Sequence, residues 1–71
     1  MIGKTNVKDL SLGQRIRLVR DKRTQTEFGL LIGRTKDHVI RYEVDVDVPS
    51  FLTLSRIARI GSVTIDWLLN G

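Results

Sequence analysis

Residues 25–43 read QTEFGLLIGRTKDHVIRYE, and this stretch decides the fold because two short helical patterns meet inside it with hardly any room for a loop. Gly29 is a small residue that lets two helices approach each other closely. Gly33, four residues later, can adopt the left-handed backbone conformation that ends a helix and redirects the chain. The stretch therefore predicts a helix-turn-helix.

The two patterns also separate an inner face from an outer face. The inner face consists of apolar residues that recur at helical spacing, namely Phe28, Ile32, Val39 and Tyr42. The outer face of the second helix then carries Lys36, Asp37, Ile40 and Arg41. An outward helix face of this kind is what the major groove of a DNA duplex admits.

Polar residues in cap positions predict five short helices. Ser11 with Gln14, and Thr24 with Glu27, have the spacing of a capping box, so the first helix is expected to open at Ser11 and the second to start at Gln25. The first should end near Lys22, and the second at residue 32 or 33. Single caps should begin the other three helices, and these caps are Thr35, Ser50 and Thr64. The third helix should run from residue 36 to about 43, and Gly61-Ser62 should end the fourth.

The segment between the third and fourth expected helices alternates strictly. It reads Val44-Asp45-Val46-Asp47-Val48 and precedes Pro49. β-Branched residues at every second position, followed by a proline, favour extended backbone. An exposed strand of this kind would offer its unpaired backbone groups to another strand.

Length and composition exclude several classes of protein. A chain of 71 residues has room for one domain, which buries only about 60% of the surface of its unfolded chain, so a deep catalytic cavity is not expected. We find no nucleophile-base pair, no carboxylate cluster with metal-ligand spacing and no phosphate-cradling loop, and we expect no enzyme. With no cysteine and one histidine, we expect no metal, no cofactor and no small-molecule ligand.

No apolar run approaches the roughly 20 residues that cross a bilayer, and the first ten residues lack the apolar stretch of a secretory signal. We therefore expect a soluble cytoplasmic protein, without a membrane partner, in a bacterial or phage-infected cell. The formal net charge is +4, but it is unevenly distributed. Residues 1–41 contain ten basic and four acidic side chains, or +6, whereas residues 42–71 contain two basic and four acidic ones, or −2. The half with the helix-turn-helix pattern is the half that attracts a polyanion.

Four short motifs, in order, resemble a known family. They are Ile16-Arg17-x-x-Arg20, Thr24-Gln25-x-x-x-Gly29-x-x-x-Gly33, Tyr42-Glu43 followed after five residues by Pro49-Ser50, and Asp66-Trp67-Leu68-Leu69-Asn70-Gly71. From about Leu12 to Gly71 the chain resembles the lambda-repressor-like, Cro-type helix-turn-helix domains (the XRE family) of phage repressors and related bacterial regulators. The resemblance implies an all-α, five-helix domain that binds double-stranded DNA, commonly as a homodimer on a near-palindromic operator. We divide the chain into an N-terminal arm, residues 1–10, and the DNA-binding domain, residues 11–71.

The resemblance also implies roles for individual residues. Gln25 matches a position that typically contacts phosphate, and Arg20 and Glu43 match a pair that often forms a salt bridge between the first and third helices. The positions that meet base edges are matched by Lys36, Asp37, Ile40 and Arg41. With the turn residues and the histidine, the expected DNA-binding set is Gln25, Arg34, Thr35, Lys36, Asp37, His38, Ile40 and Arg41.

Two departures from the family pattern affect this expectation. Arg34 stands where an apolar residue is usual, so the turn is expected to face solvent or phosphate. The loop after the third helix is acidic where family members often carry basic or polar residues that meet the DNA backbone. Because Asp45 and Asp47 would repel DNA, we expect this loop to point elsewhere or to serve another purpose.

Several of these residues have a second interpretation. Arg41 can form two hydrogen bonds with guanine, or an exposed ion pair with Asp37 one turn earlier. Asp37 can accept from cytosine or simply favour the helix N-terminus, and Ile40 can meet thymine methyl groups or be an apolar residue tolerated on the surface. Lys36 and His38 are expected at phosphates. Trp67 is expected to anchor the core or a dimer together with Leu68 and Leu69, rather than to stack on bases.

Three functions follow from these patterns. The first is a sequence-specific transcriptional regulator, a repressor in its simplest form. The second is a protein-interaction module, such as an antitoxin-like partner or an antirepressor, that uses the segment Val44–Val48. In the third, the same segment pairs two copies of a DNA-binding protein.

Overall fold

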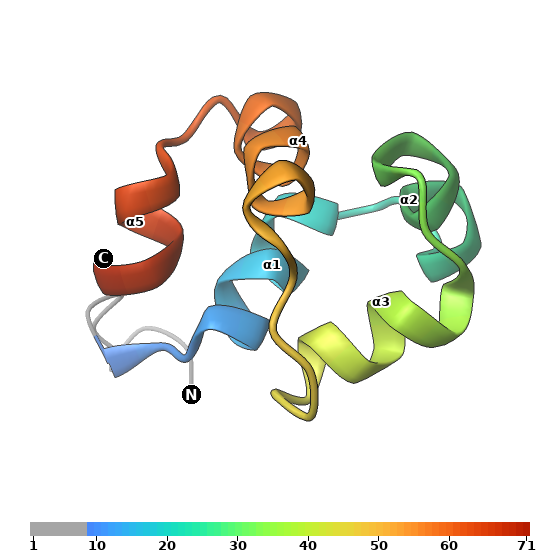
Figure 1. The fold of residues 1–71 in the computed structure, drawn as a ribbon, viewed down its shortest axis with the longest axis horizontal. Coiled ribbons are helices and arrows are strands. Elements are labelled where there is room, and N and C mark those ends of the chain that lie inside the picture. Colours follow the sequence, from blue (N-terminus) through green and yellow to red (C-terminus); the bar gives the residue numbers. More distant parts are fainter. Residues whose placement is uncertain (1–8) are drawn as a thin grey trace.

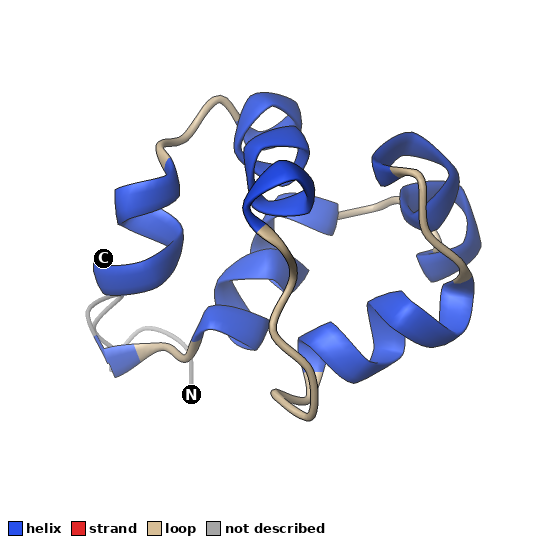
Figure 2. Ribbon diagram, viewed as in Figure 1, coloured by secondary structure: helices blue, strands red, loops and turns tan. Residues whose placement is uncertain are grey.

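The helices begin where a side-chain oxygen can accept a hydrogen bond from an otherwise unpaired backbone N–H. The computed structural model describes residues 9–71, and in this range the chain forms five helices and no strand (Figures 1 and 2). They are α1 (Leu12–Arg20), α2 (Gln25–Ile32), α3 (Lys36–Glu43), α4 (Phe51–Gly61) and α5 (Ile65–Asn70). The all-α, five-helix prediction is confirmed. The expected N-terminal arm, residues 1–10, lies outside the described residues except for its last two.

Both expected capping boxes form. The Ser11 hydroxyl accepts from the backbone N–H of Gln14 at 3.1 Å, and the Gln14 side chain accepts from the backbone N–H of Ser11 at 2.8 Å. Thr24 and Glu27 repeat this exchange at 3.0 and 2.8 Å, and the hydrogen bond from the backbone of Thr24 lowers the pKa of the Glu27 carboxyl group. Thr35, Ser50 and Thr64 cap the other three helices, as predicted.

Helix α1 ends at Arg20, two residues before the expected boundary near Lys22. The chain turns at Asp21, whose φ of 54° does not continue a helix. Helix α2 begins at Gln25 and ends at Ile32, as predicted. Gly33 has a φ of 73° and ends α2, and a Cβ on Gly29 would lie 2.7 Å from the carbonyl oxygen of Arg34. The turn between α2 and α3 therefore needs both glycines, one for its backbone conformation and one for close approach.

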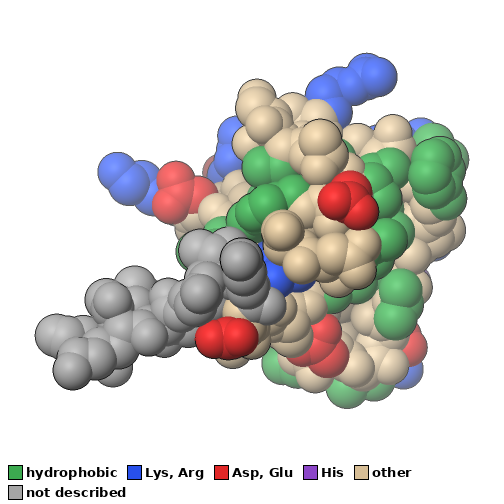
Figure 3. Space-filling model, turned by 90° about the vertical axis from the view of Figure 1, so that its left-hand side faces the viewer, with side chains coloured by type: hydrophobic (Ala, Val, Ile, Leu, Met, Phe, Trp, Pro, Cys, Tyr) green, Lys and Arg blue, Asp and Glu red, His purple; other side chains and the backbone are tan. Residues whose placement is uncertain are grey.

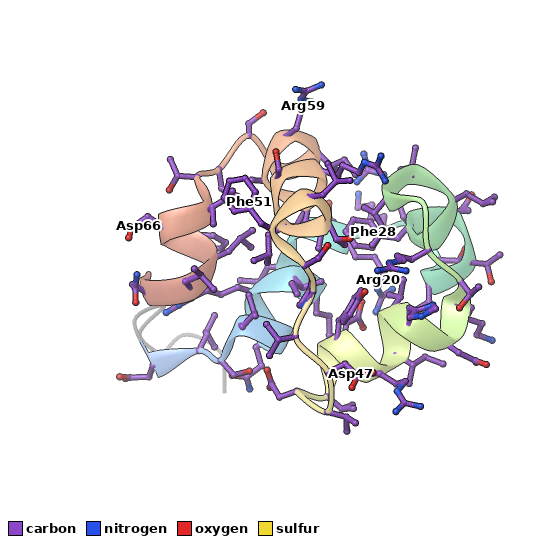
Figure 4. All side chains as sticks on the ribbon, in the orientation of Figure 1. Arg20, Phe28, Asp47, Phe51, Arg59 and Asp66 are labelled. Atoms are coloured by element: carbon purple, nitrogen blue, oxygen red, sulfur yellow. The ribbon has the colours of Figure 1, made fainter. Side chains whose placement is uncertain are left out.

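One core joins all five helices, with α1 at its centre, α2 and α3 on one side and α5 on the other (Figure 1). Its fully buried side chains are Ile16, Phe28, Ile32, Val39, Ile57 and Leu68. Figure 4 shows Phe28 pointing from α2 into the interior. Of the three expected anchors on α5, Leu68 is fully buried and Trp67 packs partly buried against the core, but Leu69 is 47% exposed. Leu69 is therefore not an anchor of the core, because so short a helix turns only one side toward α1 and α4.

The segment Val44–Val48 is not extended, and that prediction was wrong. The backbone N–H groups of Val46 and Asp47 both donate to the carbonyl oxygen of Arg41, at 2.9 and 3.3 Å, and Asp45 has a φ of 62°. These bonds fold the segment into a tight turn against the end of α3. The valines remain exposed, and Pro49 is buried beside the start of α4.

Candidate nucleic-acid interface

Helix α3 forms a ridge on the protein, because its inner side packs into the core and its outer side is exposed. Val39 and Tyr42 are buried in the core and fix the helix on α1 and α2. Its N-terminus is capped by Thr35, whose hydroxyl accepts from the backbone N–H of His38 at 3.3 Å. The exposed residues of the turn and the ridge are Arg34, Thr35, Lys36, Asp37 and Arg41. Five of the eight expected DNA-binding residues are therefore exposed in the turn or on α3.

The other three expected DNA-binding residues are half-buried rather than fully exposed. Ile40, which was expected to point outward, is half-buried, so part of its side chain packs against the protein. His38 is also half-buried, with Nδ1 at 2.8 Å from the Thr35 hydroxyl oxygen and its ring centroid 6.3 Å from that of Tyr42. The half-buried Gln25 donates from Nε2 to Oε1 of Glu43 at 3.2 Å. One of the amide hydrogens expected at a phosphate is thus already bonded within the protein.

Glu43 is the centre of this small cluster, because it also pairs with Arg20. Nε of Arg20 lies 2.6 Å from Oε2 of Glu43, and Nη2 lies 3.0 Å from Oε1, with side-chain exposures of only 14% and 5%. The hydrogen bond to Glu43 raises the pKa of Arg20, against the opposing effect of burial. In Figure 4, Arg20 lies between α1 and α3. The cluster ties the end of α1 and the start of α2 to the end of α3.

Arg41 has an acidic partner, but it is not Asp37, the residue considered from the sequence. Nε of Arg41 lies 2.7 Å from Oδ2 of Asp47, in the turn that follows α3. Both side chains are exposed, Arg41 by 57% and Asp47 by 43%. Sequence reasoning missed Asp47 as a site residue, because it considered the charge of Asp47 only as a source of repulsion. The available signal was its place directly after α3, six residues beyond Arg41.

The second aspartate of the turn binds α1 instead. Oδ1 of Asp45 accepts from the backbone N–H of Gly13 at 2.8 Å, in the first turn of α1. Gly13 is buried there, and a Cβ on it would lie 2.5 Å from the carbonyl oxygen of Tyr42. The acidic residues of the loop thus have separate contacts, one holding the loop to α1 and the other holding a side chain of α3.

The face beside α5 differs from this surface. Figure 3 views the molecule from that side, and in the described part of the chain its charged side chains are scattered among hydrophobic ones rather than gathered into a basic patch. Within residues 9–71, no helix is long and apolar enough to cross a membrane. The basic residues Arg34, Lys36 and Arg41 are exposed on the turn before α3 and on α3 itself.

Comparison with known proteins places the fold. No family model matches the sequence, and no curated protein is significantly similar to it. Among solved structures, the chain is similar to the P22 c2 repressor protein, determined in complex with synthetic operator 9T in the presence of Tl⁺. The match has a TM-score of 0.79 and 24% sequence identity, and it covers 84% of this chain and 94% of that chain. The expected lambda-repressor-like fold is therefore confirmed.

Proposed function

We propose that this chain is a sequence-specific regulator of transcription of the phage-repressor type, which binds double-stranded DNA through α3. The observation that carries the proposal is the open ridge of Lys36, Asp37 and Arg41 on a helix whose other side is fixed in the core. The fold adds support, since the P22 c2 repressor protein has the same fold and was determined with operator DNA. Residues 11–71 form the DNA-binding domain in this proposal, residues 1–10 form an arm, and the protein acts in the cytoplasm.

The division of labour follows from the positions of the side chains. Phosphate contacts from the turn and from the start of α2 would supply most of the affinity, and contacts of α3 with base edges would supply the preference for sequence. Lys36 and Arg34 are placed for the first task, and Arg41 for the second. Gln25 can still contribute its backbone N–H, which lies in the first turn of α2, even though its side chain is engaged with Glu43.

The proposal is tested by selecting bound sequences from a random duplex pool, followed by a salt titration of the selected and a random duplex. Binding should weaken steeply with salt, with a log-log slope of about −0.9 per phosphate neutralised. Arg41→Ala should reduce the preference for the selected sequence, whereas Gln25→Ala should weaken binding to both duplexes more evenly. Equal losses for both variants on both duplexes would contradict this division, and absence of duplex binding at low salt would contradict the function.

We also propose that the protein binds its operator as a homodimer. The structure leaves apolar side chains exposed in the turn after α3 and at the start of α4, and these offer contacts for a second copy; they are Val44, Val46 and Val48 in the turn and Phe51 and Leu52 in α4. A palindromic selected sequence supports the dimer. Val46→Lys should then lower the mass measured in solution or the cooperativity of binding, and an unchanged dimer would exclude this surface.

The same exposed surface favours the second candidate function, a protein-interaction module. Its original basis was a strand edge at residues 44–48, and the tight turn found there removes that basis. What remains is an apolar surface without a backbone edge, which suits side-chain packing rather than strand addition. Folded protein that binds no duplex at low salt would favour this candidate.

A further inference from the structure

We propose that Asp47 is a positioning residue that orients Arg41 toward a guanine base. This inference rests on the proposed DNA-binding function and adds a specificity determinant outside α3. The decisive contact is the 2.7 Å hydrogen bond from Nε of Arg41 to Oδ2 of Asp47. An arginine side chain on a helix surface otherwise samples many rotamers, and fixing one of them before binding reduces the entropy lost on contact with DNA.

The atoms involved decide what Arg41 can still do. Asp47 accepts from Nε, so both terminal Nη groups stay available as a two-pronged donor. Guanine presents two acceptors, O6 and N7, side by side in the major groove, and a bidentate arginine is the common partner of this pair. A carboxylate that binds the guanidinium at Nε therefore orients the group and leaves both Nη groups free to donate to the base.

The support for Asp47 is itself rigid, which is what a positioning role requires. The backbone N–H groups of Val46 and Asp47 donate to the carbonyl oxygen of Arg41, so the turn is anchored to the same residue whose side chain it holds. The neighbouring Asp45 binds the backbone of α1 through Gly13 at 2.8 Å. In Figure 4, Asp47 lies beside α3, close to its C-terminal end. The backbone that carries the Asp47 carboxylate is therefore held on one side by α3 and on the other, through Asp45, by α1.

Two effects of Asp47 on binding oppose each other, and this makes its role recognisable. Its negative charge repels phosphates and weakens binding to every duplex. Its hold on Arg41 favours the duplex that has guanine at the contacted position. Removing the charge should therefore strengthen binding to random DNA while weakening discrimination. A residue that only stabilises the fold would lower both affinities together.

The test compares Asp47→Asn, Arg41→Lys and Asp21→Asn by selection from a random duplex pool and by titration of the selected and random duplexes at one salt concentration. Asp21 is exposed at the end of α1, so its substitution is a control that removes the same charge without touching Arg41. Asparagine keeps an acceptor oxygen but loses the charge that strengthens the hydrogen bond from Nε of Arg41, so we expect Asp47→Asn to reduce the preference by about three- to tenfold, which is part of the discrimination that a bidentate arginine provides. Random-duplex affinity should stay the same or rise. The control should leave the preference unchanged.

The position of the lost preference is the second readout. Asp47→Asn should relax the same base pair that Arg41→Lys relaxes, and when the two substitutions are combined, Asp47→Asn should have no further effect at that pair. Relaxation at a different pair, or none, in variants that still bind duplex DNA would overturn the role of Asp47 while leaving the proposed function intact. Failure of the unmodified protein to bind any duplex at low salt would instead overturn the proposed function, and with it this inference.

Discussion

Glu43 has more partners than any other acidic residue in the described range, and its burial decides what its charge contributes. Two nitrogens of Arg20 and the amide of Gln25 donate to its two oxygens, and its side chain is 5% exposed. A paired charge at such a site adds little beyond an apolar residue, but an arginine left there without its carboxylate is costly. The cluster should therefore matter more for the packing of α1 against α3 than for contact with DNA.

Glu43→Gln should destabilise the domain, because Arg20 loses the charge of its partner while staying mostly buried. The substitution keeps the size and one acceptor, so we expect a loss of about 1–2 kcal/mol in the free energy of unfolding at neutral pH, measured with urea. Glu27→Gln is the matched control, since Glu27 is exposed and glutamine also completes a capping box. Similar effects for both substitutions would show that the Arg20–Glu43 pair has no special weight.

The turn after α3 contacts two helices within a few residues, since it bonds to the end of α3 and to the first turn of α1. Asp45 adopts a φ of 62°, which costs energy for most residues but is tolerated by aspartate and asparagine, and its carboxylate accepts from the first turn of α1. The negative charge also suits the N-terminus of α1, whose first turn contains no acidic residue of its own. The element thus serves as a cap for a helix 32 residues away in sequence.

Asp45→Ala should remove the hydrogen bond to the backbone of Gly13 and the negative charge at the N-terminus of α1. We expect it to lower the free energy of unfolding by about 1–2 kcal/mol, the scale of a lost helix cap. Asp45→Asn keeps an acceptor oxygen and tolerates the positive φ, so it should retain most of the stability. Thermal and urea unfolding of the two variants measure this difference. If asparagine destabilises as much as alanine, the carboxylate charge rather than the hydrogen bond and backbone conformation maintains the turn.

The same element shows where prediction from sequence reached its limit. The helix boundaries at Ser11, Thr24 and Gly33 depend on contacts within four residues, so local patterns sufficed to place them. The turn at residues 44–48 depends instead on Gly13, far away in sequence, and on the end of α3. Alternating valines indicated extended backbone, but capping bonds to Arg41 outweighed that local preference. The Arg41–Asp47 contact was missed for the same reason, since it exists only once the turn has folded back.

At the scale of the whole molecule, a chain of 71 residues has little stability to lose. Domains of this size are stable by about 4–10 kcal/mol, so emptying one fully buried site in the core removes a large part of the total. Leu68 is fully buried, and its carbonyl oxygen accepts from Nη1 of the buried Arg15 at 3.4 Å. The ring of Trp67 also contacts Arg15, whose guanidinium lies 5.8 Å from the ring centroid.

Leu68→Ala should therefore remove about 2–5 kcal/mol, because it empties a site enclosed by α1 and α4. Leu69→Ala makes the same chemical change one residue later, where 47% exposure limits the loss to less than about 1 kcal/mol. Urea unfolding measures both, and duplex binding separates stability from recognition. Since α5 lies across the core from α3, Leu68→Ala should reduce the fraction of protein able to bind without changing which sequence is preferred. A changed preference, or equal stability losses at the two leucines, would mean that α5 does more than close the core.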